Sequence, residues 1–163
     1  MYNTGLEAFF AGILAACIAQ ILKVILFIIV HKKIDFKILT TTGGMPSSHS
    51  AGVIALSTSV GLIEGFTSIP FAIAMGFSLV VIQDAQGLRR AAGKTAATLN
   101  RLISDWNIQT GQSKPYEVLK ELLGHTPFEV LMGIILGVLI ALFVHFQLPH
   151  YVDFDSIISN FIK

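Results

Sequence analysis

An apolar run of 26 residues, Gly5–Val30, opens the chain, and only Glu7 and Lys23 carry charge within it. A helix of about 20 apolar residues crosses the hydrocarbon core of a bilayer, so this run is long enough. It lacks a preceding basic segment and a small-residue cleavage site, and it exceeds the length of a signal-peptide core. We therefore predict a retained membrane-spanning helix.

Three further stretches are apolar enough to span, namely residues 50–66, 69–88 and 127–146. The 163-residue chain is 53% hydrophobic and 13% charged. That charged share is about half of the usual value, which leaves too little polar surface for a soluble monomer. The sequence therefore predicts an all-α integral membrane bundle of about four transmembrane helices, in a single domain over residues 1–163.

The lysines and arginines of the loops predict the orientation of the bundle. Basic residues gather in the connector after the first span and in residues 89–120, whereas the turn at residues 65–70 has none. Cytoplasmic loops carry such an excess. We therefore expect both termini outside, and a cytoplasmic helical segment at residues 91–123 with a break at 111–115. Residues 148–163 have a weak apolar periodicity typical of an interfacial segment.

The chain has a single cysteine, Cys17, so no internal disulfide can form. A cysteine within an apolar run is usually a small buried residue, which is our expectation for Cys17. His31, His145 and His150 lie at the ends of spans without polar neighbours in the sequence, and we expect them at the membrane interface.

Lys23 lies inside the first predicted span, with Gln20 one turn before it on the same helical face. Two interpretations are open. The lysine either extends to the headgroup layer or faces the bundle interior as a cation for an anionic ligand.

Residues 43–51, with the sequence GGMPSSHSA, precede and begin the second span. Glycines permit close backbone approach, and proline followed by serine is typical of a helix start. The free N–H groups and positive dipole of a helix start favour an anion. We therefore predict an anion site that includes Ser47, Ser48 and His49.

Two further groups of polar residues flank the remaining spans. Asp84 lies among apolar residues just before Arg89 and Arg90, which either flank the membrane or bind an anion. His125 precedes the fourth span, and Glu129 follows it by four residues, close enough to orient the imidazole. On the predicted topology, these groups lie at one depth with His49, which favours a single site.

These blocks, GGMPSSHSA, DAQGLRRAAG and LGHTPFEV, resemble the divergent branch of the type-2 phosphatidic acid phosphatases, also called acid phosphatase/vanadium-dependent haloperoxidase-related. The resemblance extends from Gln20 to about Gly137. It implies that His125 is the nucleophile, Glu129 its orienting carboxylate and His49 the general acid. The wider superfamily has Arg-Pro after the first-motif lysine and Ser-Arg before the nucleophile, and neither pair is present here.

The resemblance implies a metal-independent phosphatase that hydrolyses a lipid or prenyl phosphate monoester, with no cofactor. Lys23 would stand for the first-motif lysine, and Ser47 and Ser48 would bind phosphate with it. As our own inference, Arg89 and Arg90 would supply the missing cations, with Asp84 orienting them. We expect the site at the cytoplasmic face of a bacterial plasma membrane, and no nucleic-acid partner. Two alternatives remain: a non-catalytic binder or transporter of an anionic lipid headgroup, and a metal enzyme with His49, Asp84, His125 and Glu129 as ligands.

Overall fold

The computed structural model describes residues 4–32, 44–110, 118–119 and 124–147. These residues form helices and short connections, with no strand among them, which confirms the predicted all-α fold. The elements in chain order are α1 (Gly5–His31), α2 (Ser48–Glu64), α3 (Ile69–Gln83), the π-helix η2 (Asp84–Leu88), α4 (Arg89–Thr110) and α5 (Pro127–Phe146).

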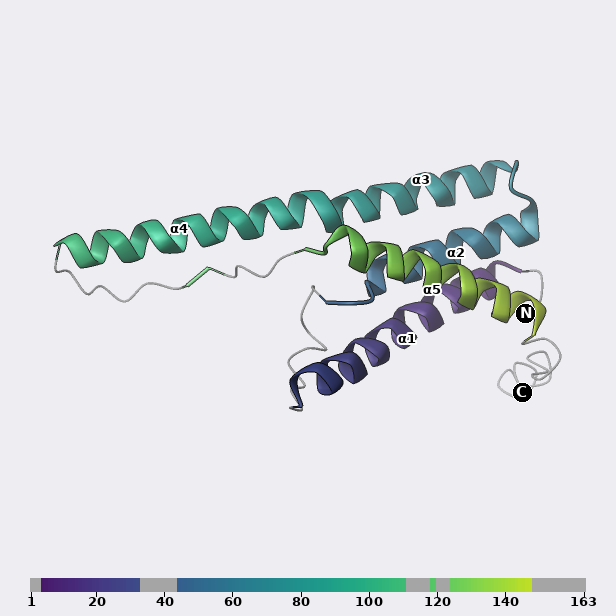
Figure 1. Ribbon diagram of the computed structural model, residues 1–163. Coiled ribbons are helices and arrows are strands. Elements are labelled where there is room, and N and C mark those ends of the chain that lie inside the picture. Colours follow the sequence, from purple (N-terminus) through teal and green to yellow (C-terminus); the bar gives the residue numbers. More distant parts are fainter. Residues whose placement is uncertain (1–3, 33–43, 111–117, 120–123, 148–163) are drawn as a thin grey trace, which may run out of the picture.

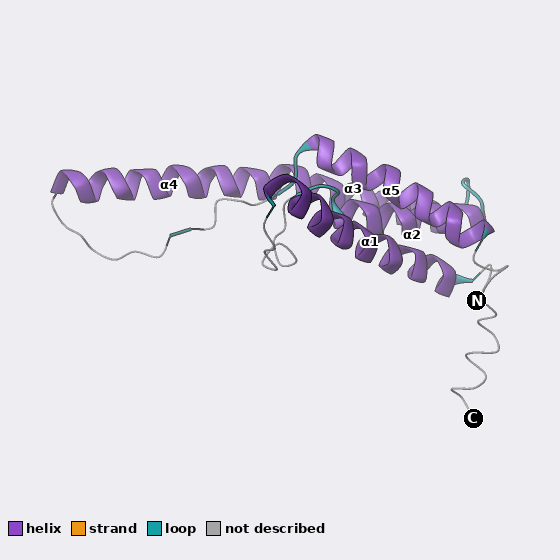
Figure 2. Ribbon diagram, turned by 60° about the horizontal axis from the view of Figure 1, so that its bottom comes forward, coloured by secondary structure: helices purple, strands orange, loops and turns teal. Residues whose placement is uncertain are grey.

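Helix α2 lies at the centre of a bundle and packs against α1, α3 and α5 (Figure 1). Helices α1 and α5 also pack against each other, whereas α4 projects beyond the bundle (Figure 2). In the described part of the chain, three helical stretches are long and apolar enough to cross a membrane: Gly5–Val30, Ile69–Gln109 and Pro127–Phe146. The 17 residues of α2 match the lower limit of about 17 for a span. The chain is therefore an integral membrane bundle.

A short turn makes α2 and α3 antiparallel neighbours. Gly65 ends α2 with φ of 93°, a value that glycine adopts without strain. The Ser68 side chain then accepts a hydrogen bond from the Phe71 backbone N–H at 3.3 Å, and Pro70 follows in the first turn of α3. This serine cap and the nearby proline are both typical helix-start features.

Small residues bring the helices of the bundle into close contact. A Cβ atom added to Gly133 of α5 would lie 2.5 Å from the Ser47 carbonyl oxygen, and one added to Gly137 would lie 2.6 Å from that of Ala51. Close backbone approach through small residues is characteristic of helix packing in membranes. The buried core is correspondingly rich in alanine on three helices: Ala11, Ala15 and Ala19 of α1, Ala51 and Ala55 of α2, and Ala141 of α5.

The third predicted span, residues 69–88, continues without a break into α4. The π-helix Asp84–Leu88 joins α3 to α4, so the helical run extends well beyond the predicted boundary. The Asn100 side chain of α4 donates to the Leu119 carbonyl at 2.9 Å and accepts from the Leu119 N–H at 3.0 Å. These two bonds hold the returning chain at Leu119 against α4. The predicted break at 111–115 and the tail at 148–163 lie outside the described residues.

Two expectations about single residues are wrong. Cys17 is exposed, because it lies on the outward face of α1 that also carries Ile13 and Ile21. His145 is buried, and its Nδ1 lies 2.7 Å from Glu7 Oε1 across α1 and α5. The sequence separates this pair by 138 residues, so only the packed bundle reveals it. The His31 side chain and His150 lie outside the described part.

Candidate functional site

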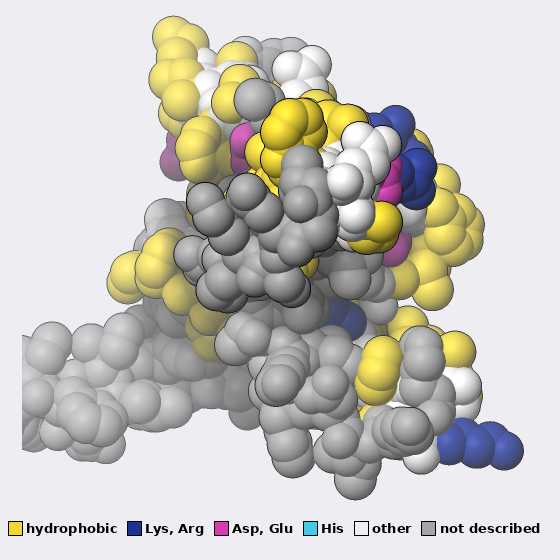
Figure 3. All heavy atoms as spheres, turned by 90° about the vertical axis from the view of Figure 1, so that its left-hand side faces the viewer, with side chains coloured by type: hydrophobic (Ala, Val, Ile, Leu, Met, Phe, Trp, Pro, Cys, Tyr) yellow, Lys and Arg dark blue, Asp and Glu magenta, His cyan; other side chains and the backbone are white. Residues whose placement is uncertain are grey.

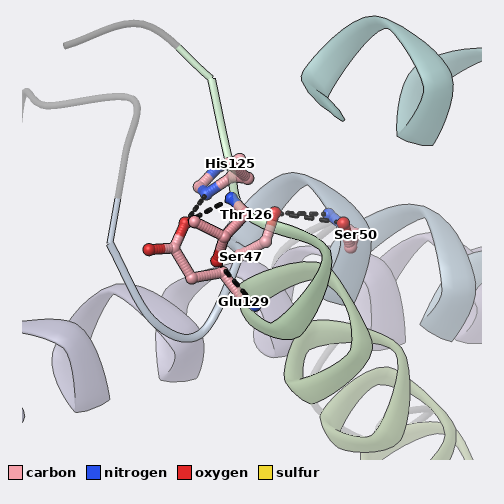
Figure 4. Close-up of polar contacts among 5 residues, drawn as sticks. All are labelled: Ser47, Ser50, His125, Thr126 and Glu129. Carbon is pink, nitrogen blue, oxygen red and sulfur yellow. Dashed lines mark hydrogen bonds and ion pairs between the residues drawn. The ribbon is translucent and has the colours of Figure 1, made fainter. Parts of the chain in front are cut away.

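The loop before α5 places His125 beside the first turn of that helix. Gly124 has φ of 90°, a conformation suited to glycine, and precedes His125. Thr126 caps the helix by accepting a hydrogen bond from the Glu129 N–H at 3.3 Å, and Glu129 Oε2 accepts from the Thr126 N–H at 3.0 Å. This reciprocal pair is a capping box. It fixes the Glu129 carboxylate next to the histidine (Figure 4).

The His125 imidazole is held at one nitrogen and left unpaired at the other. Its Nδ1 lies 3.1 Å from Glu129 Oε2, and its backbone N–H donates to the Ala85 carbonyl at 2.9 Å. The side chain is 2% exposed, and Nε2 is buried without a hydrogen-bond partner. A carboxylate at Nδ1 favours the tautomer with the proton on Nδ1. The lone pair of Nε2 is then available to an electrophile or a proton.

The π-helix contributes the carbonyl that anchors His125. Each N–H in a π-helix bonds to the carbonyl five residues earlier, and such segments are frequent at functional sites. Ala85 lies within η2, and its carbonyl accepts a hydrogen bond from the His125 N–H, which lies outside the helix. This contact joins the loop before α5 to the junction of α3 and α4. The sequence gives no evident signal for the π-helix beyond Gly87.

Burial lowers the pKa of His125 below its ordinary value of 6.5. The hydrogen bond to Glu129 and the negative charge of that carboxylate raise the pKa, each by less than burial lowers it. The positive charges of Lys23 and, when protonated, His49 lower it further. The imidazole is therefore neutral at pH 7, which is the form that has a free lone pair.

The start of α2 docks onto the start of α5. The Ser47 N–H donates to the Glu129 carbonyl at 3.0 Å. The Ser47 Oγ caps α2 by accepting from the Ser50 N–H at 3.3 Å and from the Ser50 hydroxyl at 3.0 Å (Figure 4). Ser47, Ser48 and Ser50 are all buried. The positive end of the α2 dipole therefore lies beside the His125–Glu129 pair.

Lys23 faces the bundle interior rather than extending to the headgroup layer. Its side chain is 4% exposed. A Cβ atom on Gly44 would lie 3.3 Å from Lys23 Cδ, so glycine at position 44 leaves room for the lysine. Because its charge lowers the pKa of His125, Lys23 lies within electrostatic reach of the imidazole. Lys23 thus supplies a buried positive charge to the same site.

His49, in the first turn of α2, is exposed, and its ring centroid lies 6.2 Å from that of His125 with 59° between the ring planes. The structure therefore brings together residues from three separate segments of the chain: Lys23, Ser47, His49, His125 and Glu129. Two imidazoles at this separation can approach one small ligand from two sides.

The site residues predicted at the α3–α4 junction have fewer described contacts with His125 than those of α1, α2 and α5 do. Asp84 is half-buried and immediately precedes Ala85, whose carbonyl contacts His125. Arg90 carries an exposed side chain at the start of α4. The Arg89 side chain lies outside the described part. Among the described side chains, Arg90 makes no contact with His49, His125 or Glu129.

Several basic side chains are exposed at the end of the molecule that carries the site. Figure 3 views this end, and dark blue Lys and Arg side chains show there beside yellow hydrophobic ones. The exposed basic residues of the described helices at or beyond this end are Lys32, Arg90, Lys94 and Arg101. Within the described ranges, no three His, Cys, Asp or Glu side chains are grouped as metal ligands.

Comparison with known proteins agrees with this architecture. Residues 5–140 match the model of a family described as the divergent PAP2 family. The uncharacterized membrane protein YuiD of Bacillus subtilis (strain 168) is 42% identical over 141 residues, which cover 81% of this chain and 89% of that protein. No solved structure matches the chain.

Proposed function

Since this chain belongs to the divergent PAP2 family, we propose that it hydrolyses a lipid or prenyl phosphate monoester through a phosphohistidine at His125. One observation carries the proposal: the buried His125 imidazole is bonded to Glu129 at Nδ1 and has no partner at Nε2. A histidine held in this way is an oriented nucleophile.

The reaction follows from the two imidazoles. The Nε2 lone pair of His125 attacks phosphorus while the ester P–O bond breaks on the opposite side. Protonated His49 gives its proton to the departing alkoxide, which leaves as an alcohol. Neutral His49 then takes a proton from water, whose oxygen attacks the phosphohistidine. The bond between phosphorus and Nε2 breaks as the new P–O bond forms, its electron pair returns to His125, and phosphate leaves with His49 protonated again.

Positive groups around the site stabilise the charge of the transition state. Buried Lys23 and the N-terminal end of α2 at Ser47 and Ser48 would bind the phosphoryl oxygens. Arg89 and Arg90 would add cations from the start of α4 once substrate is bound, with Asp84 orienting them. The Glu129 carboxylate contacts Nδ1 of His125, so its negative charge lies on the side of the ring away from the attacking Nε2.

The membrane defines the substrate class. The site lies where α2 and α5 begin and where α1 ends, at one end of the bundle (Figure 1). A phosphate at this depth would be that of a lipid or prenyl headgroup whose apolar part remains in the bilayer. The basic loops favour the cytoplasmic side for the site and the external side for both termini.

The test is phosphate release by the purified protein in detergent, with phosphatidic acid and a prenyl monophosphate as substrates. Release should continue in EDTA and stop with vanadate, which mimics five-coordinate phosphorus. Release that needs an added divalent ion would favour the metal enzyme. No release from any monoester would reject the phosphatase.

A second candidate is a non-catalytic binder or transporter of an anionic headgroup. Leu119 and Lys120 occupy the sequence positions where the resembled superfamily has Ser-Arg, and Arg90 is exposed. Lys23 is thus the one buried cation seen at the site among the described residues. This reading predicts that the protein binds a lipid phosphate, with affinity lost in Lys23→Met, and leaves the ester intact.

A further inference from the structure

A groove runs along the bundle surface and ends at the site. Its floor is formed by α2, one wall by α1 and the other by Phe77 of α3, and its volume is about 780 Å³. That volume lies within the range of about 300–1,000 Å³ that is usual for small-molecule sites. None of the described residues that line it is Lys, Arg, Asp or Glu.

The groove changes character along its length. At the end nearer the site, it is lined by Gln20, Ser48 and His49. Phe9 and Ile13 line the remote part of the α1 wall. Twelve residues separate Phe9 from Ile21 on α1, about 18 Å at the rise of an α-helix. The groove therefore has a polar end at His49, whose ring centroid lies 6.2 Å from that of the buried His125, and an apolar part that extends along α1.

Two glycines bring the α1 wall and the α2 floor of the groove into close backbone contact. A Cβ atom on Gly12 would lie 3.2 Å from the Gly52 carbonyl oxygen, and one on Gly52 would lie 3.3 Å from the Gly12 carbonyl oxygen. The backbones of α1 and α2 therefore approach closely along the groove. Its outer rim is apolar and exposed at Phe9, Ile13 and Phe77, as a surface in contact with lipid would be.

We propose that this groove holds one hydrocarbon chain of the lipid or prenyl monophosphate and so aligns its phosphate between His49 and His125. The inference rests on the proposed function for the identity of the headgroup. The complementarity is of polarity: the phosphate end of the ligand meets Ser48 and His49, and the chain meets uncharged apolar walls. The hydrocarbon chain of the lipid is surrounded by apolar groups both in the groove and in the bilayer, so its transfer into the groove gains little hydrophobic free energy. The groove would instead act by aligning the phosphate for reaction.

Binding can be measured without turnover. A phosphatidic acid with a diazirine in one acyl chain is reconstituted with the full-length protein, irradiated, and its adducts are located by mass spectrometry. Adducts should concentrate on Ile13, Cys17 and Phe77 over the equally exposed Ile135 and Leu139 of α5. Adducts spread evenly over both faces would overturn the groove assignment, whether or not the protein is a phosphatase.

A pair of variants tests alignment. Cys17→Trp places a large side chain in the groove from an exposed position, and Leu139→Trp makes the same addition on the lipid-facing side of α5. The ratio of kcat/KM for phosphatidic acid to that for p-nitrophenyl phosphate should fall about tenfold in Cys17→Trp, because misplaced reactants react more slowly. Leu139→Trp should keep the ratio of the parent protein.

The outcomes separate the two proposals. An unchanged ratio in Cys17→Trp, with both substrates hydrolysed, would overturn the groove inference and leave the phosphatase intact. Failure to hydrolyse either ester in the parent protein would reject the phosphatase, and the adduct map would then decide the groove alone. Diazirine adducts that persist on Ile13 and Phe77 in Cys17→Trp at parent levels would also contradict the inference.

Discussion

Glu129 has two tasks at the residue scale, and both follow from its place in the first turn of α5. Its carboxylate accepts from the Thr126 N–H, which caps the helix, and from Nδ1 of His125. The helix dipole favours a negative charge at this position. The capping contacts therefore fix the carboxylate before it orients the imidazole, and the histidine gains a defined direction at little cost in side-chain entropy.

Glu129→Gln should shift the acidic limb of the pH–rate profile to lower pH. Catalysis needs neutral His125, so activity falls as the pH drops through the pKa of this residue. The carboxylate raises that pKa, and its removal should lower it further. The rate at neutral pH should fall by about 10–100-fold, the loss seen when carboxylates that orient metal-binding histidines are removed. The measurement is kcat/KM between acidic and neutral pH; a shift to higher pH would contradict the assigned contact.

Lys23→Met should shift the same limb in the opposite direction. The Lys23 charge lowers the pKa of His125, so its loss should raise that pKa and move the limb to higher pH. Substrate affinity should fall as well, because a buried cation for phosphate is removed. Lys23→Arg, which keeps the charge, is the control. An unchanged profile in Lys23→Met would place the lysine away from His125.

At the scale of elements, contact between α2 and α5 positions the site. Gly133 faces the Ser47 carbonyl, and Ser47 both caps α2 and donates its N–H to the Glu129 carbonyl. The two helix starts therefore form one unit in which the positive end of the α2 dipole meets the histidine that precedes α5. Sequence patterns predict each helix start alone, through serine or threonine caps and proline. They do not predict that these two starts touch.

Gly133→Ala should separate the two helix starts. Its Cβ atom would lie 2.5 Å from the Ser47 carbonyl oxygen and 3.0 Å from Ser50 Cβ, so the helices must move apart. We expect destabilisation of about 1–3 kcal/mol, typical of overpacking, with a loss of activity. Thermal unfolding in detergent measures the first effect, and phosphate release measures the second.

Gly76→Ala is the matched control for this substitution. Nothing lies within 4 Å of a Cβ atom at Gly76 in α3. Alanine should be neutral there or stabilise the helix by up to about 1 kcal/mol. Equal stability of the Gly133→Ala and Gly76→Ala proteins would show that α2 and α5 do not approach closely at Ser47.

Some of these elements and contacts can be predicted from the sequence, and others cannot. The apolar runs predict α1, α3 and α5, because length and hydrophobicity suffice for a span. The i, i+4 spacing predicts the His125–Glu129 contact, because both lie at one helix start. The π-helix at Asp84–Leu88 and the Glu7–His145 pair depend on contacts between distant segments. Local propensity and spacing contain no information on those contacts.

At the scale of the whole molecule, the polar groups divide between two ends of an apolar bundle. One end has Lys23, His49, His125 and the basic side chains, and the other has the turn between α2 and α3 and the buried Glu7–His145 pair (Figure 1). The exposed surface between them is rich in large apolar side chains on α1, α3 and α5. This arrangement suits a protein whose site meets a headgroup layer on one side only.

The orientation can be read with single cysteines in a Cys17→Ala background, because the chain has no other cysteine. Lys94→Cys in α4 should react with an impermeant thiol reagent only in inside-out vesicles. Thr67→Cys, in the turn before α3, should react in intact cells. Both positions are exposed, so access depends on the side of the membrane. The reverse pattern would place the site on the external face.

The most direct test of the whole account is the capture of a phosphorylated His125. The purified protein is mixed briefly with ³²P-labelled phosphatidic acid, quenched in alkali, and the labelled peptide is sequenced. We predict an alkali-stable, acid-labile label on His125 that is absent from His125→Ala and accumulates in His49→Ala with a substrate that has a good leaving group. His49→Ala should accumulate it because water then lacks its base. A parent protein that releases phosphate without any label on His125, or an active His125→Ala protein, would contradict the account.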